Sequence, residues 1–231
     1  ARRTIREWAD SGLGVQEAYR WLQASIGERL LVDKTPSYSG WSEVLGRAEQ
    51  LFDSPLYIHL MRHPCGMIRS YVEANLHEET QMRFGFGGQA PFPPPQMAEL
   101  VWTIGHQNIA GLLAGVPAER QHRLCFEDLV RRPEQTMREV CRFLRLEFRG
   151  GMILPYEHPE RKMVDGVTAQ DRMSGDQKFL FAHKAIDPAV ADAWKQHLAS
   201  DILGPPARQL AADFGYEHLG EAPAAMADGP T

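Results

Sequence analysis

The sequence predicts an α/β fold with a mainly parallel sheet flanked by helices. Three short apolar runs, at residues 29–33, 56–61 and 123–126, have the length and composition of buried strands. A helical pattern follows each of them. Alternation of strands and helices is typical of parallel sheets, which present ligands at the carboxyl ends of their strands.

The predicted helices are placed by apolar periodicity and by proline. After the first run, residues 41–52 carry an apolar stripe. Pro64 and Pro133 stand where a first helical residue is expected after the second and third runs. Further helical patterns cover 97–113, 188–198 and 205–214. The first residues are already helical in pattern, with no strand before them, so the chain reads as N-terminally incomplete.

Composition narrows the class of protein. The 231 residues, 43% of them hydrophobic, suffice for one substantial core. A net charge of −5 argues against extended nucleic-acid binding, and no run of 18 apolar residues predicts a membrane span. Three cysteines without a CxxC pair argue against a disulfide framework and against zinc, and favour a reducing, cytoplasmic setting.

Two segments interrupt the regular pattern. Residues 77–97 include MRFGFGGQAPFPPP, whose glycines, prolines and aromatic residues predict a loop or lid. Residues 220–231 are rich in alanine, glycine and proline, which predicts a linker or a disordered tail. The domain is therefore expected to span residues 1–219.

The first candidate binding motif is LVDKTPSY. It places Lys34 and Thr35 one and two residues beyond a predicted strand, at the edge where a parallel sheet presents its ligands. An ordinary strand-to-loop exit is the alternative.

The second candidate motif is MRHP followed by RS. Arg62 lies just beyond a predicted strand, and Ser70 lies within the first two turns of the next helix. A guanidinium group, a hydroxyl group and a helix N-terminus that face one place suit a phosphate dianion. The alternative is a solvated arginine beside an ordinary helical serine.

The two motifs resemble those of the sulfotransferases that use 3′-phosphoadenosine-5′-phosphosulfate (PAPS). The segment CFEDLV, followed by Pro133 and Phe143-Leu144, is similar to a third motif of that family. Longer stretches, among them YIHLMRHP, ERQHRLCFEDLVRRP and GDQKFLFAH, resemble the sulfotransferase domains of olefin-forming polyketide synthases. The likeness extends from about residue 30 to residue 220.

The resemblance implies a P-loop-NTPase-like fold and roles for individual residues. Arg62 and Ser70 would bind the 3′-phosphate of PAPS, and Lys34, with Thr35, would contact the transferring sulfuryl group. Arg172 and Lys178 lie in a polar stretch similar to the family's late donor-binding segment, although a plain surface loop is the alternative. The family's Gly/Ser-rich strand–loop–helix, which grips the 5′-phosphosulfate, has no counterpart here. It is expected to precede Ala1, or else the domain holds the donor poorly.

An acceptor hydroxyl requires a general base, and His106 is the first candidate. Imidazole titrates near neutrality, and the helix after the predicted lid should face the active cleft. The alternative is a helical histidine packed beside Trp102, one turn earlier. His77 and Asp33 are substitutes. No metal is expected: His59 and His63 have metal-like spacing, but they lie on a strand exit.

The sequence therefore predicts sulfuryl transfer from PAPS to a hydroxyl. The resemblance implies the β-hydroxyl of a polyketide chain on an acyl carrier protein, held by phosphopantetheine, with an adjacent thioesterase domain releasing a terminal alkene. Rival hypotheses are a free-standing sulfotransferase for a small alcohol or sugar, a P-loop kinase, and a degenerate domain that only binds a partner. A row of arginines either docks the acidic carrier protein or forms a solvated face: Arg138, Arg142, Arg145 and Arg149.

Overall fold

The structure is a computed structural model, and it describes residues 2–83, 92–157, 184–196 and 202–216. A two-stranded parallel sheet lies at its centre, formed by β1 (Tyr57–Met61) and β2 (Gln121–Cys125). The register pairs Tyr57 with Gln121 and Met61 with Cys125, so both strands end at the same edge. The strands predicted at 56–61 and 123–126 are thereby confirmed, and with them the α/β class.

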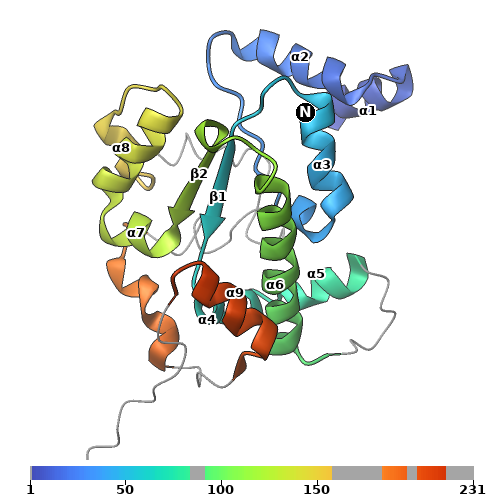
Figure 1. Cartoon of the computed structure of the whole chain (residues 1–231). Coiled ribbons are helices and arrows are strands. Elements are labelled where there is room, and N and C mark those ends of the chain that lie inside the picture. Colours follow the sequence, from blue (N-terminus) through green and yellow to red (C-terminus); the bar gives the residue numbers. More distant parts are fainter. Residues whose placement is uncertain (1, 84–91, 158–183, 197–201, 217–231) are drawn as a thin grey trace, which may run out of the picture.

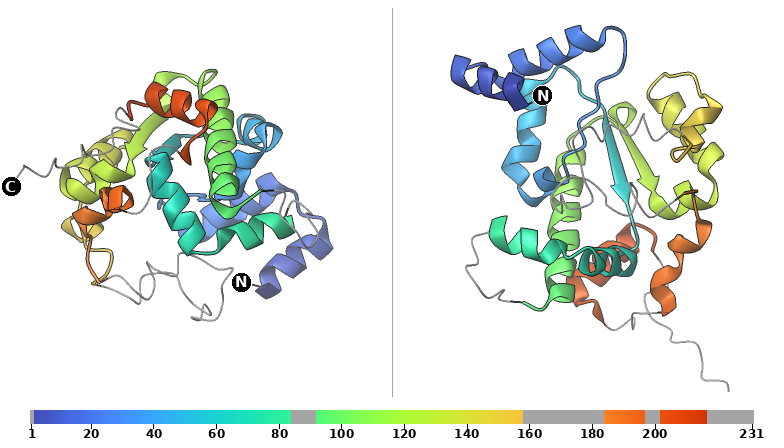
Figure 2. Two further views of the ribbon diagram at one scale, coloured as in Figure 1. Left: turned by 90° about the horizontal axis from the view of Figure 1, so that it is seen from below. Right: turned by 180° about the vertical axis from the view of Figure 1, so that it is seen from behind.

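The strand predicted at 29–33 does not form. These residues are extended, and Figures 1 and 2 show the segment running beside β1 without joining it. Leu30 is 46% exposed and Val32 is 68% exposed. Parallel strands are stable when a neighbour pairs with them and both faces are covered. Within the described part of the chain, nothing completes a ladder with this segment, so its apolar residues do not suffice.

Helices cover the sheet on both sides (Figure 1). Helices α3 (Ser42–Leu51) and α6 (Pro94–Leu113) lie on one side, and α7 (Phe126–Arg131) and α8 (Pro133–Phe143) lie on the other. Helices α3 and α8 begin within one residue of the predicted positions, α6 begins three residues earlier than predicted, and α7 was not predicted. The remaining elements are α1 (Arg2–Ser11), α2 (Val15–Ile26), η1 (Pro36–Gly40), α4 (Pro64–Glu73), α5 (Leu76–Arg83), η2 (Ala118–Arg120), η3 (Gly150–Ile153), η6 (Pro188–Ala191), η7 (Ala193–Gln196) and α9 (Pro205–Asp213).

The predicted lid is more regular than expected at its two ends. Helix α5 occupies residues 76–83, and α6 already begins at Pro94. Proline has no backbone N–H, but at the first positions of a helix that N–H would have no partner within the helix. Pro94 and Pro95 therefore start α6 instead of preventing it. Residues 84–91 and the predicted tail lie outside the described residues. The helix predicted over 188–198 is two short 3₁₀ helices, η6 and η7, as far as residue 196.

The main hydrophobic core lies at the end of the sheet to which β1 points. Helices α4 and α9 both pack against α6 there, as the view from below shows (Figure 2). Burial of this apolar surface fixes the position of α4, which begins directly after β1. The core residues are Cys65, Ile68, Tyr71, Ala98, Trp102, Leu203, Ala207 and Ala211.

Candidate active site

The junction between β1 and α4 is built from Arg62, His63 and Pro64. Pro64 is the first residue of α4, and the Nδ1 atom of His63 caps the helix by accepting the backbone N–H of Cys65 at 3.2 Å. The imidazole of His63 stacks on Trp194 with ring centroids 4.0 Å apart. Burial lowers the pKa of His63 to about 4, so this ring is neutral near pH 7. His63 therefore shapes the junction.

Arg62 is held at both its backbone and its side chain. Its carbonyl oxygen accepts the indole N–H of Trp102 at 3.0 Å, and its guanidinium carbon lies 4.3 Å from the centroid of the Phe126 ring. A Cβ atom at Gly66 would lie only 3.3 Å from Nε of Arg62. The absence of a side chain at Gly66 thus allows the arginine to lie against the first turn of α4.

Ser70 lies on the same face of α4 as Gly66, because residues four apart in a helix are neighbours on its surface. Arg62, Gly66 and Ser70 therefore form one strip that starts at the N-terminus of α4. Both polar side chains are half-buried. A guanidinium group, a hydroxyl group and the partial positive charge of a helix N-terminus together favour a bound phosphate.

The Lys34 segment is held by hydrogen bonds to Asp33. Thr35 donates its hydroxyl to Oδ1 of Asp33 at 2.5 Å, and the hydroxyl of Tyr19 donates to Oδ2. Burial and the neighbouring carboxylate raise the pKa of Tyr19, which stays protonated. Lys34 itself is exposed. Both oxygens of Asp33 are engaged, so it is a poorer substitute base than its sequence position indicates.

The segment after Lys34 reaches the helix that carries His106. Helix η1 packs on α6, where Asn108 donates its side-chain N–H to the carbonyl oxygen of Ser39 at 2.9 Å. The Cβ position of Gly105 lies 3.0 Å from Oγ of Ser39. The KTPSY motif and the predicted base are therefore on two elements in direct contact.

His106 is buried and is paired with a second histidine. Its Nδ1 atom lies 2.8 Å from Nε2 of His59, at the middle of β1. Burial lowers the pKa of both rings to about 4. The ring centroid of Trp102 is 4.8 Å from that of His106, so the predicted packing with Trp102 is present. Whether His106 also serves as the base remains a prediction.

The remaining predicted site residues are His77, Arg172 and Lys178. Nδ1 of His77, the substitute base on α5, is buried and has no hydrogen-bond partner among the residues that the structure describes. Arg172 and Lys178 fall outside the described residues. Across the described ranges, no group of three or more His, Cys, Asp or Glu side chains is placed to hold a metal ion. Nor does any helix in those ranges combine the length and the apolar character needed to cross a membrane.

The sequence reasoning missed several residues at the junction. Glu127 belongs to the CFEDLV motif, but no role was inferred for it; its carboxyl group accepts the backbone N–H of His63 at 2.9 Å. Trp194 and His59 were missed as well, because their partners are distant in sequence. The only available signal was an acidic residue, Glu127, directly after a predicted strand.

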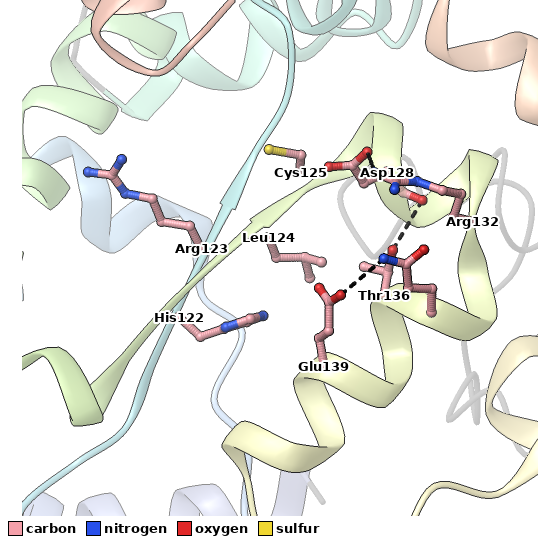
Figure 3. Close-up of a pocket in the computed structure, with 9 residues that line it drawn as sticks. His122, Arg123, Leu124, Cys125, Asp128, Arg132, Thr136 and Glu139 are labelled. Atoms are coloured by element: carbon pink, nitrogen blue, oxygen red, sulfur yellow. Dashed lines mark hydrogen bonds and ion pairs between the residues drawn. The ribbon is translucent and has the colours of Figure 1, made fainter.

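A pocket of about 120 Å³ lies beyond β2, on the side of α8 (Figure 3). Its polar side chains bind one another: Asp128 pairs with Arg132 at 2.5 Å, and Gln135 donates to Glu139 at 3.3 Å. Arg123 points to the opposite side of the strand in Figure 3. None of the predicted site residues lines this pocket, so the candidate active site is at the β1–α4 junction and not here.

Comparison with known proteins gives the family and the fold of the chain. The sequence model of a family described as the Sulfotransferase family matches residues 7–150. The nodulation protein NoeE of Sinorhizobium fredii (strain NBRC 101917 / NGR234) is 27% identical over 218 residues, which cover 87% of this chain and 48% of NoeE. The chain thus spans about half the length of that relative.

Two solved structures are similar over 96% of the chain. One is a sulfotransferase domain from the curacin biosynthetic pathway, with a TM-score of 0.81, 34% identity and 74% of its own length covered. The other is a sulfotransferase domain from the olefin synthase of Synechococcus PCC 7002, with a TM-score of 0.76, 31% identity and 70% covered.

Proposed function

Because the chain belongs to the sulfotransferase family, we propose that it transfers a sulfuryl group from PAPS to a hydroxyl group of its acceptor. The observation that carries this proposal is the strip of Arg62, Gly66 and Ser70 at the N-terminus of α4. The catalytic unit in this proposal spans residues 1–219, and residues 220–231 are assigned as a linker or a tail.

The donor's two charged ends are assigned to two segments. Arg62 and Ser70 bind the 3′-phosphate, which the first turn of α4 also attracts. Lys34 and Thr35 lie toward the sulfuryl group, where an ammonium group offsets the charge that develops on the bridging oxygen. Arg172 and Lys178 complete the donor site in this assignment.

PAPS supplies a sulfuryl group bonded to a good leaving group. The acceptor oxygen forms a bond to sulfur as the bond from sulfur to the 5′-phosphate oxygen breaks, and adenosine 3′,5′-bisphosphate leaves. The contribution of the chain is positioning and charge stabilisation, as in phosphoryl transfer.

His106 receives the acceptor's proton in this mechanism. When Nδ1–H of His106 donates to Nε2 of His59, the Nε2 atom of His106 keeps its lone pair and can accept a proton. Burial lowers the pKa of His106 to about 4, which keeps the ring neutral at pH 7 and also makes it a weaker base than a solvated imidazole. The mechanism requires this tautomer, because a proton donated from Nε2 of His59 to Nδ1 of His106 would leave Nε2 of His106 protonated.

The proposed acceptor is the β-hydroxyl of an acyl chain attached to an acyl carrier protein through phosphopantetheine. Support comes from the two structural neighbours, which belong to a curacin pathway and an olefin synthase. Sulfation would turn this hydroxyl into a leaving group. A thioesterase-type domain would then promote decarboxylative elimination to a terminal alkene.

Mass spectrometry tests the proposal. The complete natural polypeptide is incubated with PAPS and a carrier protein that bears a β-hydroxyacyl chain. One added sulfuryl group is expected, and Arg62→Ala should reduce it strongly. Sulfation of a free alcohol but not of the carrier-bound chain would overturn the acceptor assignment. Failure to sulfate any acceptor or to bind adenosine 3′,5′-bisphosphate would overturn the proposed function.

A further inference from the structure

Glu127 joins three segments at the carboxyl edge of the sheet. It lies in the first turn of α7, and only 9% of its surface is exposed. Oε1 accepts the backbone N–H of His63, 64 residues away, and Oε2 accepts the hydroxyl of Tyr216, 89 residues away, at 3.1 Å. Buried side chains with two such bonds fix the groups that they contact.

The position of Glu127 follows from the strand register. Met61 pairs with Cys125, so His63 and Glu127 are each two residues past the end of their strand. Beyond that last pair, the sheet no longer offers a partner to the N–H of His63. The carboxyl group of Glu127 supplies that partner and so continues the connection between the two strands past the ladder.

The ring of His63 is held from two further directions. Trp194 stacks on it with an angle of 12° between the rings, and Tyr216 meets it edge-on with centroids 5.4 Å apart. Trp194 also lies 3.4 Å from the Cβ position of Gly66. One buried carboxyl group therefore holds both the backbone of His63 and the tyrosine that packs on its ring.

We propose that Glu127 is a positioning residue for the donor site: it fixes the backbone between β1 and α4 so that Arg62 and Ser70 face the same phosphate. This inference rests on the proposed function. Glu127 bonds to the backbone of His63 from α7. In this proposal it acts on the donor site through His63 and does not contact the donor itself. Its loss should weaken donor binding and leave the chemical step little changed once donor is saturating.

The test uses Glu127→Ala and Glu127→Gln in the complete natural polypeptide. Alanine removes both acceptors, whereas glutamine keeps an oxygen for the N–H of His63, and the hydroxyl of Tyr216 can rotate to accept from the new amide. The matched control is Asp128→Asn, which removes the neighbouring carboxylate of an exposed pair with Arg132. Tyr216→Phe removes the bond to Oε2 of Glu127, together with the contact of the Tyr216 hydroxyl with Cys125, and keeps the bond to His63; it serves where Glu127→Ala folds poorly.

Calorimetry with adenosine 3′,5′-bisphosphate and steady-state kinetics in PAPS give the readouts. For Glu127→Ala, we expect Kd and the KM for PAPS to rise about ten- to a hundredfold, the range for losing a hydrogen bond to a charged group. We expect kcat to change about threefold or less, and glutamine to restore binding. Tyr216→Phe should have a smaller effect of the same kind, and Asp128→Asn none.

Wild-type donor affinity in Glu127→Ala, or a loss of kcat with unchanged Kd, would overturn the inference. So would a Glu127→Gln variant as impaired as alanine. These outcomes are separate from failure of the proposed function, in which the wild-type protein itself would not bind the nucleotide.

Discussion

Arg62 and Lys34 each follow an extended segment, but their surroundings differ in burial. Around Arg62, the backbone is bonded to Trp102 and, one residue later, to Glu127, and both of these side chains are at most 9% exposed. Around Lys34, the supporting bonds come from Tyr19 and Thr35 to an exposed Asp33, and no strand pairing is present within the described residues.

This difference indicates that the two halves of the proposed donor site are fixed by different forces. Buried hydrogen bonds and packed rings determine the position of Arg62, whereas hydrogen bonds open to water determine that of Lys34. Exposed hydrogen bonds contribute less to stability, since water competes for both partners. Substitutions around Arg62 should therefore have the larger effects.

The largest expected effect comes from Arg62→Ala. Removing the guanidinium group should weaken binding of adenosine 3′,5′-bisphosphate about a hundredfold, the loss expected for a forked charge-assisted contact. Arg62→Lys should recover only part of the affinity, because an ammonium group lacks the planar fork. Isothermal calorimetry measures both, with Arg47→Ala, an exposed arginine of α3, as the control. Equal affinities for Arg62→Ala and the control would remove Arg62 from the site.

A fall in pH should destabilise the buried region on the Arg62 side, because that region contains three buried imidazoles. The pKa values of His59, His63 and His106 are each lowered to about 4 by burial, whereas unfolded histidines titrate near 6.5. Between these values the unfolded state binds more protons, so stability falls as pH falls from about 6.5 toward 4. Each ring contributes up to about 1.4 kcal/mol per pH unit. Urea unfolding at pH 7, 6 and 5 measures the slope.

A His63→Asn variant identifies which ring is responsible for part of that slope. Asparagine keeps a capping oxygen for α4 but does not titrate. The free energy of unfolding should therefore depend less steeply on pH in His63→Asn than in the wild type. An unchanged slope would show that His63 takes up its proton in the folded protein as readily as in the unfolded chain.

Gly66→Ala distinguishes an effect on the position of Arg62 from an effect on the stability of α4. The new Cβ would lie 3.3 Å from Nε of Arg62 and 3.4 Å from Trp194, so the guanidinium group must shift. We expect about a three- to tenfold loss of nucleotide affinity, of the order that a displaced contact produces. The matched control is Gly46→Ala in α3, where nothing lies within 4 Å; it should only stabilise the helix by about 0.5–1 kcal/mol. Gly66→Ala with full affinity would mean that Arg62 does not need this space.

The smallest expected effect is that of Tyr19→Phe on the Lys34 side. It removes one hydrogen bond to Asp33 and leaves that from Thr35. Stability should fall by about 0.5–1 kcal/mol, and kcat should change little. Thermal unfolding and turnover at saturating PAPS measure both. A tenfold loss of kcat would show that the Lys34 segment is as tightly constrained as the junction, and the contrast between the two regions would not hold.

Local signals in the sequence predicted much of the fold. Proline at the first helical position predicted α4 and α8, and apolar runs predicted β1 and β2. The run at 29–33 has the same composition, but a strand also needs a partner, which composition does not encode. The prediction that failed is therefore one that depends on a neighbour.

In the candidate site too, local placements were predicted from the sequence, and contacts between distant segments were not. Arg62 and Ser70 were predicted because eight residues across a strand–helix junction set their placement, and the packing of Trp102 on His106 follows from helical spacing. The partner of His106 is 47 residues away on β1, and that of His63 is 64 residues away on α7. No periodicity links such pairs, so only the folded chain reveals them.

The stacked pair of His63 and Trp194 makes the β1–α4 junction spectroscopically visible. An indole that lies 4.0 Å from a neighbouring ring has an emission sensitive to any movement of that ring. The side chain of Lys195, 5.9 Å from the same indole, adds a nearby charge. The difference in fluorescence between the wild type and Trp194→Phe therefore isolates one tryptophan among five. The protein contains its own optical probe, stacked on the residue that follows Arg62, with no label attached.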